Sequence, residues 1–123
     1  AVFLARQGAD KPEVQRQFAQ RFGYDLSRSL AEVRETYRFD ESCQGTVPQA
    51  ITAFLESTDY EDAVRNAVSL GGDADTLAAI SGGIAQAHYG SIPVTLREWV
   101  RWRLPHDLWD VVQRFEKRFG MAV

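Results

Sequence analysis

Apolar residues recur at intervals of three and four along most of the chain, which is the spacing of helices that bury one side. Val14, Phe18 and Phe22 follow this spacing early in the chain. The same spacing returns near the end of the chain, at Leu108, Val112, Phe115 and Phe119. No segment shows the strict alternation of a half-buried strand. The pattern therefore predicts an all-α protein.

Capping residues mark the ends of the first predicted helices. Asp10 precedes a helix with proline in its first turn, and Gly23 is suited to end that helix. Ser29 and Glu32 have the spacing of a capping box, which predicts a short helix toward Tyr37.

A second capping box, Thr46 with Gln49, predicts a helix with Pro48 in its first turn, after a loop over residues 39–45. The apolar residues of this helix are Ala50, Ile51, Phe54 and Leu55. Asp59 gives a weaker start signal for the next helix. We expect that helix to turn four residues inward, and they are Ala63, Val64, Ala67 and Val68.

The helix predicted from Leu77 to Tyr89 carries little side-chain bulk. Its small residues are Ala78, Ala79, Ser81, Gly82, Gly83, Ala85 and Ala87. Because glycine lowers intrinsic helix stability, such a helix needs close neighbours, and we expect it at the centre of a bundle. Gly90 is its predicted C-cap. Beyond it, Pro105 separates two amphipathic helices.

The composition sets limits on function. The chain has 123 residues, 14 Lys plus Arg against 17 Asp plus Glu, and a formal net charge of −3, which gives no electrostatic reason to expect nucleic acid. No apolar stretch is long enough to span a bilayer, so we expect no membrane partner. Cys43 is the only cysteine, which excludes an internal disulfide and favours a cytoplasmic setting. We expect its thiol to be buried and inert.

The segment Gly71-Gly72-Asp73-Ala74-Asp75-Thr76 has the strongest chemical signal. At a turn that leads into a helix, Asp73, Asp75 and Thr76 can converge, and glycines supply the permissive backbone. Hard oxygen ligands of this kind suit Mg²⁺, Mn²⁺ or Ca²⁺. Asp and Thr are also favoured as helix caps, so a purely structural role stays open.

The stretch from Leu70 to Ile80 strongly resembles the C-terminal metal motif of the ADP-ribosylglycohydrolase family. Its continuation to Pro93 resembles the same family, and so do the segments Cys43 to Ala50 and Glu61 to Ala67. The resemblance covers at least residues 24–93, in the family's order and spacing. The family commonly has a polar residue at position 74, where this chain has alanine in a spacer position.

This resemblance implies an orthogonal helical bundle and a hydrolase that cleaves the glycosidic bond between ADP-ribose and an acceptor, with two Mg²⁺ or Mn²⁺ ions. It assigns Asp73, Asp75 and Thr76 as metal ligands, Asp73 and Asp75 as catalytic residues, and Asp75 as the best candidate to bridge both ions. The substrate-binding candidates are Ser42, Gln44, Gly45, Thr46 and Gly72. For the first four of these, a polar loop that feeds a capped helix is an equal alternative.

The family's other metal-binding segment, of Thr-Asp-Asp-Thr type, does not occur in this chain. We therefore expect residues 1–123 to form one domain that is the C-terminal half of the family's domain, and to be inactive alone. The expected partners are an ADP-ribosylated substrate and either the missing N-terminal half or a second copy through self-association. A non-catalytic ADP-ribose-binding or structural protein with the same fold remains the alternative.

Overall fold

The computed structural model describes residues 1–120, and within them every regular element is an α-helix. This confirms the predicted all-α class. The helices in chain order are α1 (Val2–Arg6), α2 (Lys11–Phe22), α3 (Leu30–Thr36), α4 (Cys43–Leu55), α5 (Tyr60–Val68), α6 (Ala74–Tyr89), α7 (Val94–Arg103) and α8 (His106–Phe119). The chain divides into two compact units, of which the first is Ala1–Gly90 and the second begins at Ser91.

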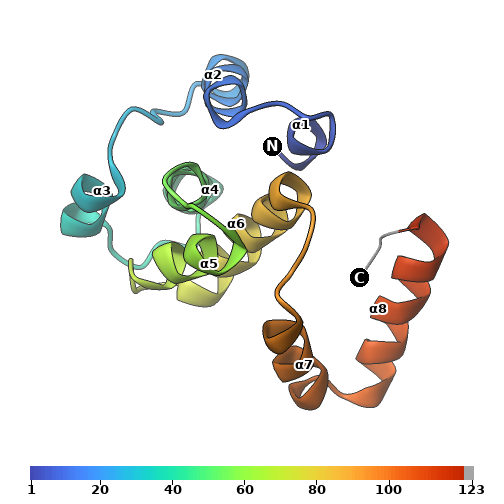
Figure 1. Ribbon diagram of the computed structural model, residues 1–123. Coiled ribbons are helices and arrows are strands. Elements are labelled where there is room, and N and C mark those ends of the chain that lie inside the picture. Colours follow the sequence, from blue (N-terminus) through green and yellow to red (C-terminus); the bar gives the residue numbers. More distant parts are fainter. Residues whose placement is uncertain (121–123) are drawn as a thin grey trace. The chain divides into compact units, whose positions relative to one another are not determined.

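In the first unit, α4, α5 and α6 pack against one another, α1 packs on α6, and α3 packs on α4 (Figure 1). The buried side chains form two clusters. One cluster includes Val33 and Leu77, and the other includes Val14, Ile51 and Phe54. Helices α4, α5 and α6 each contribute to both clusters, so these three helices form the core of this unit.

The caps predicted at Asp10, Gly23, Ser29 and Asp59 are confirmed. The Asp10 side chain accepts a hydrogen bond from the Glu13 backbone N–H at 2.9 Å, and Gly23 ends α2 in the left-handed conformation. Ser29 forms both bonds of its capping box at the start of α3. Asp59 caps α5 by accepting from the backbone N–H of the third helical residue at 2.8 Å. These ends follow from bonds between residues close in sequence, which is why the pattern could predict them.

Helix α4 begins four residues earlier than the capping box at Thr46 predicts. Ser42 is its N-cap, and the Ser42 hydroxyl accepts from the Gly45 backbone N–H at 3.0 Å. Thr46 is buried, and its hydroxyl donates to the Asp40 backbone oxygen at 2.9 Å rather than capping the helix. As a result, Cys43 is the first helical residue and is exposed, so the expectation of a buried thiol is wrong.

Helix α5 turns fewer residues inward than expected. Ala63 and Ala67 are fully buried and Val64 is half-buried, whereas Val68 is 51% exposed. Successive residues on a helix are rotated by about 100°, so Val68 lies to one side of the face that the two alanines define. It is also one turn beyond Val64, at the last residue of the helix. The expectation that Val68 points inward is therefore wrong.

Helix α6 buries one side only. On that side, an added Cβ at Gly82 would lie 3.4 Å from atoms of Tyr60 and of Val64, which confirms close packing between α5 and α6. On the other side, Ala79 and Gly83 are exposed, and a Cβ at Gly83 would have no neighbour within 4 Å. The expected close neighbours are present, since α1, α4 and α5 all pack on this helix, but among the described residues its Ala79 and Gly83 side is open, so the expected central position is correct only in part.

The second unit contains α7 and α8, as predicted from the break at Pro105. A two-pronged ion pair joins them, in which Arg97 Nη1 and Nη2 lie 2.5 and 2.6 Å from the two carboxylate oxygens of Glu116. Neither helix contains a fully buried residue. Among the described residues, we find no helix with the length and apolar character needed to cross a bilayer.

Candidate functional site

The loop between α5 and α6 depends on two glycines. Gly71 and Gly72 both have positive φ angles, of 73° and 58°, which side chains rarely adopt. A Cβ at Gly72 would also lie 2.7 Å from a ring carbon of Tyr37 and 3.2 Å from the Cα of Phe39. Any larger residue would be strained and would push against a neighbouring segment. The loop can therefore pass close to residues 37–39 only because position 72 is glycine.

Asp73 stands at the N-cap position of α6, but its side chain makes no capping hydrogen bond. Its ψ angle is 58°, whereas Asp10 and Asp59, which do cap their helices, have the extended ψ angles of ordinary N-caps. The Asp73 backbone N–H is held separately, by donating to the Tyr37 hydroxyl at 3.3 Å. The structural alternative of a helix cap thus fails for Asp73, and its carboxylate is left for another role.

The Asp75 carboxylate lies next to that of Asp73. A hydrogen bond with the Asp73 side chain, followed by one from the Thr76 backbone N–H at 2.9 Å, holds the pKa of Asp75 below its ordinary value. Asp73 is half-buried, and Asp75 and Thr76 are exposed on the first turn of α6. The turn therefore brings two carboxylates together at the surface. Thr76, which has a hydroxyl, is the next residue in the chain after Asp75.

The chemistry of this donor set fits a hard divalent cation, because carboxylate and hydroxyl oxygens are the ligands that Mg²⁺ and Mn²⁺ prefer. The set is small, since two carboxylates and one hydroxyl cannot fill the roughly six positions around each such ion. Across residues 1–120, no cluster of three or more His, Cys, Asp or Glu side chains is arranged to hold a metal. The described residues thus offer a partial ligand set.

The predicted substrate-binding residues divide by exposure. Ser42 and Gln44 are exposed near the start of α4, and Gly45 is half-buried. Thr46 is only 4% exposed, and its hydroxyl is already donated within the loop. Gly72 lies in the other loop, against Tyr37.

Residues 37–40 connect these two regions, and the sequence reasoning missed them. Tyr37 and Phe39 contact Gly72, whereas the Asp40 carboxylate lies where a side chain at Gly45 would otherwise be. The hydroxyl and then the backbone N–H of Ser42 hold the pKa of Asp40 below its ordinary value. A single chain segment therefore contacts both the metal-motif loop and the start of α4. A sequence signal for this segment is Tyr37, an aromatic residue at the end of a capped helix that is followed by a mostly polar stretch.

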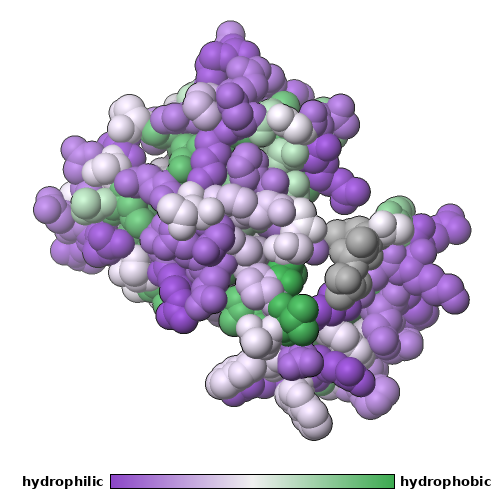
Figure 2. Space-filling view, in the orientation of Figure 1, coloured by the Kyte–Doolittle hydropathy of each residue, from purple (hydrophilic) through white to green (hydrophobic). Residues whose placement is uncertain are grey.

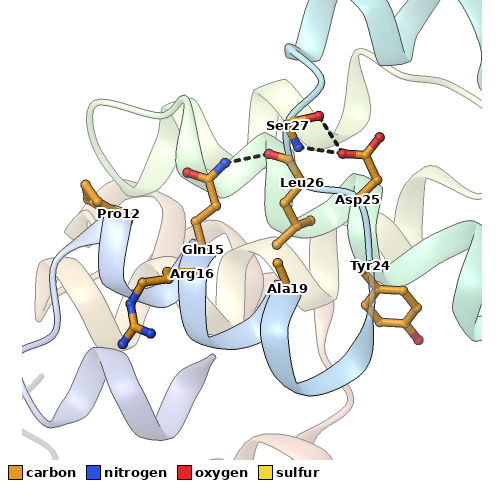
Figure 3. Close-up of a pocket in the computed structure, with 8 residues that line it drawn as sticks. All are labelled: Pro12, Gln15, Arg16, Ala19, Tyr24, Asp25, Leu26 and Ser27. Atoms are coloured by element: carbon orange, nitrogen blue, oxygen red, sulfur yellow. Dashed lines mark hydrogen bonds between the residues drawn. The ribbon is translucent and has the colours of Figure 1, made fainter.

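A pocket of about 340 Å³ lies elsewhere in the first unit, between α2 and the extended segment that follows it (Figure 3). The Gln15 amide donates to the Leu26 backbone oxygen at 2.6 Å across this pocket, and Asp25 accepts from the backbone N–H of Ser27 at 2.9 Å. Tyr24 and Arg16 also line it. None of the predicted site residues is among its lining residues.

The family model described as ADP-ribosylglycohydrolase matches residues 2–122, which is nearly the whole chain. A search of curated proteins and a search of solved structures each found no match.

Proposed function

Because the chain belongs to the ADP-ribosylglycohydrolase family, we propose that it supplies part of a metal-dependent site that hydrolyses the glycosidic bond between ADP-ribose and an acceptor. Asp73, Asp75 and Thr76 are the proposed ligands, for Mg²⁺ or Mn²⁺. We propose that the protein acts in the cytoplasm.

The observation that carries this proposal is the position of Asp73. A helix cap would accept a hydrogen bond from its own helix, as Asp10 and Asp59 do, but Asp73 does not. Instead, the Asp73 carboxylate lies within hydrogen-bonding reach of the Asp75 carboxylate. Two like charges at such a distance repel each other unless a proton or a cation lies between them. A divalent ion would resolve this repulsion.

The residues of this chain have separable roles in the proposed site. Asp73 and Asp75 would bind the cations, and Asp75, the more exposed of the two, would bridge two ions. Thr76 would add a neutral oxygen. Bound divalent ions would supply positive charge that holds the ribose hydroxyls and stabilises charge as the bond breaks. Since this donor set is partial, we propose that the remaining ligands come from an N-terminal segment of the family's type.

The segment at the start of α4 would contribute contacts to the ADP-ribosylated substrate. Ser42 and Gln44 are exposed there, so their side chains are available to a ligand. Gly45 and Gly72 would act indirectly, because the absence of a side chain lets Asp40 lie against Gly45 and Tyr37 lie against Gly72, which shapes both loops. The buried Thr46 would act indirectly, because its hydroxyl bond to Asp40 holds the shape of this segment.

The experiment compares Asp75→Asn with Asp59→Asn. Both changes remove one carboxylate charge from the start of a helix, but only Asp59 is a cap in the structure. Mn²⁺ binding to the 123-residue chain is measured by electron paramagnetic resonance. Turnover of an ADP-ribosylated substrate is measured against Mg²⁺ concentration, with the N-terminal segment supplied.

We expect Asp75→Asn to weaken Mn²⁺ binding about tenfold or more and to abolish turnover, while the free energy of unfolding changes by less than about 0.5 kcal/mol. Asp59→Asn should leave both metal binding and turnover unchanged, because asparagine also caps helices. If the two variants show the same metal affinity and rate as the unmodified chain, Asp75 is no ligand. The fold would then have a structural or non-catalytic ADP-ribose-binding role.

A further inference from the structure

Helix α8 has an apolar stripe that stays exposed. Leu108, Val111, Phe115 and Phe119 follow one another at helical spacing, and each is at least 50% exposed. The side of α8 visible in Figure 2 is mostly hydrophilic, as expected for a helix whose apolar residues gather on another side. A continuous stripe of this kind on a helix is a typical contact surface for another helix.

The two flanks of this stripe differ. On one flank, Glu116 forms the ion pair with Arg97, and the Arg97 guanidinium lies 5.2 Å from the centre of the Trp109 ring. That flank is therefore occupied by α7. On the other flank lie the exposed charges Asp107 in the first turn and Arg118 in the last. At about 100° per residue these two differ by only about 20° around the helix axis. Arg114 lies about 20° beyond Asp107, farther from the stripe, where it pairs with Asp110 of the same helix at 3.1 Å.

We propose that the α8 stripe binds α8 of a second copy of this chain in an antiparallel pair. With full overlap, His106 lies opposite Phe119 of the second copy, and this places Asp107 opposite Arg118 of the second copy. Twofold symmetry repeats the same contact at the other end of the pair. A parallel twofold pair would instead bring the flank with Asp107 and Arg118 against the Glu116 flank of the second copy, where α7 already lies. The charges beside the stripe and the position of α7 thus together select the partner and its direction.

The same charges argue against a lipid surface as the occupant. An amphipathic helix on an anionic membrane has basic residues along both edges of its apolar face. Here a carboxylate, Asp107, borders the stripe near its beginning, and a second acidic residue borders it on the α7 side. An oppositely charged residue from a second helix compensates Asp107, whereas anionic lipid would repel it.

The pair is a weak one, because two 14-residue helices bury less surface than a stable dimer needs. We expect a dissociation constant on the order of 10 µM at low salt, with weaker association at higher salt. Sedimentation equilibrium of the complete 123-residue chain over a range of concentrations measures this constant. Circular dichroism checks that each variant keeps its helix content.

The decisive experiment reverses the two charges separately. Asp107→Arg gives a copy with arginine at both positions 107 and 118, and Arg118→Asp gives a copy with aspartate at both. Each variant alone should associate about tenfold more weakly, because like charges then meet at both ends of the pair. An equimolar mixture of the two variants should recover association as a mixed pair. A variant that merely disturbs its own helix would not be rescued by mixing.

The matched control is Asp110→Arg. Asp110 carries the same charge on the same helix, but it lies about 160° around the axis from the stripe, where it pairs with Arg114 of its own helix at 3.1 Å. This change should leave the association constant within about twofold. Three results would overturn the proposal: a monomer up to about 100 µM, equal weakening by Asp110→Arg, or no recovery in the mixture. Binding to phosphatidylserine vesicles by a monomeric chain would also count against it, and would indicate a membrane surface instead.

Discussion

The two units of this chain differ in how their helices are buried. In the first unit, α4 and α6 contain side chains that are completely inaccessible, such as Phe54 and Leu77. In the second unit, α7 and α8 contain none, and Trp102 is 85% exposed. Both units have well-formed helices with apolar residues at helical spacing. The difference teaches that an amphipathic pattern predicts a helix but does not predict how completely that helix is covered.

Residue size gives a physical reason for the difference. Ala53, Ala63 and Ala85 are fully buried in the first unit, where small residues let three helices come close together. The contact between α7 and α8 instead rests on long side chains, with Arg97 reaching Glu116. Long polar side chains connect helices without excluding water from the apolar residues between them.

The largest expected effect comes from truncating one phenylalanine in each unit. Phe54→Ala should lower the free energy of unfolding of the first unit by about 3–5 kcal/mol, because it leaves a cavity beneath a fully buried side chain. Phe115→Ala, at a residue that is 54% exposed, should cost less than about 1 kcal/mol. Urea unfolding followed by circular dichroism at low protein concentration measures both values. Equal losses would mean that the two units are buried alike.

A smaller contrast is expected between two neighbouring glycines of α6. Gly82→Leu should destabilise the chain by about 1–3 kcal/mol, because its Cβ already meets Tyr60 and Val64 at 3.4 Å and the remaining atoms have no space. Gly83→Leu should be neutral or stabilising by up to about 1 kcal/mol, since it adds helix propensity at an open position. The melting temperatures of the two variants decide this. A destabilising Gly83→Leu would show that another surface covers that side of α6.

The smallest effect is expected at the ion pair of the second unit. Arg97 holds the pKa of Glu116 below its ordinary value of 4.5, so the pair stabilises the hairpin above that pH and the stabilisation is lost as the pH falls below it. A double-mutant cycle with Arg97→Gln and Glu116→Gln should give a coupling of about 1 kcal/mol at pH 7. The coupling should shrink as the pH falls below 4.5 and be lost once Glu116 is protonated in the folded state. A coupling that persists in acid would show that the two side chains interact by packing rather than by charge.

The sequence by itself determined most helix ends. Asp10, Ser29 and Asp59 cap their helices as predicted, and Gly90 ends α6 in the left-handed conformation. These signals act between residues three or four apart, so they need no knowledge of the rest of the fold. The same locality explains the misplaced start of α4. Ser42 and Thr46 both offer a cap, and the contact of Thr46 with the Asp40 backbone left Ser42 as the cap of α4.

The sequence also determined the family and the residues of the candidate site, because the motif from Gly71 to Thr76 is read directly from the chain. Only the tertiary structure decided that Asp73 is no cap, that Tyr37 holds its backbone N–H, and that Val68 is exposed. The bond from the Asp73 backbone N–H to Tyr37 joins residues 36 positions apart in sequence, so no local pattern could predict it. Local bonds thus fixed where helices begin and end, whereas packing between distant segments decided which faces are covered and which carboxylates remain free.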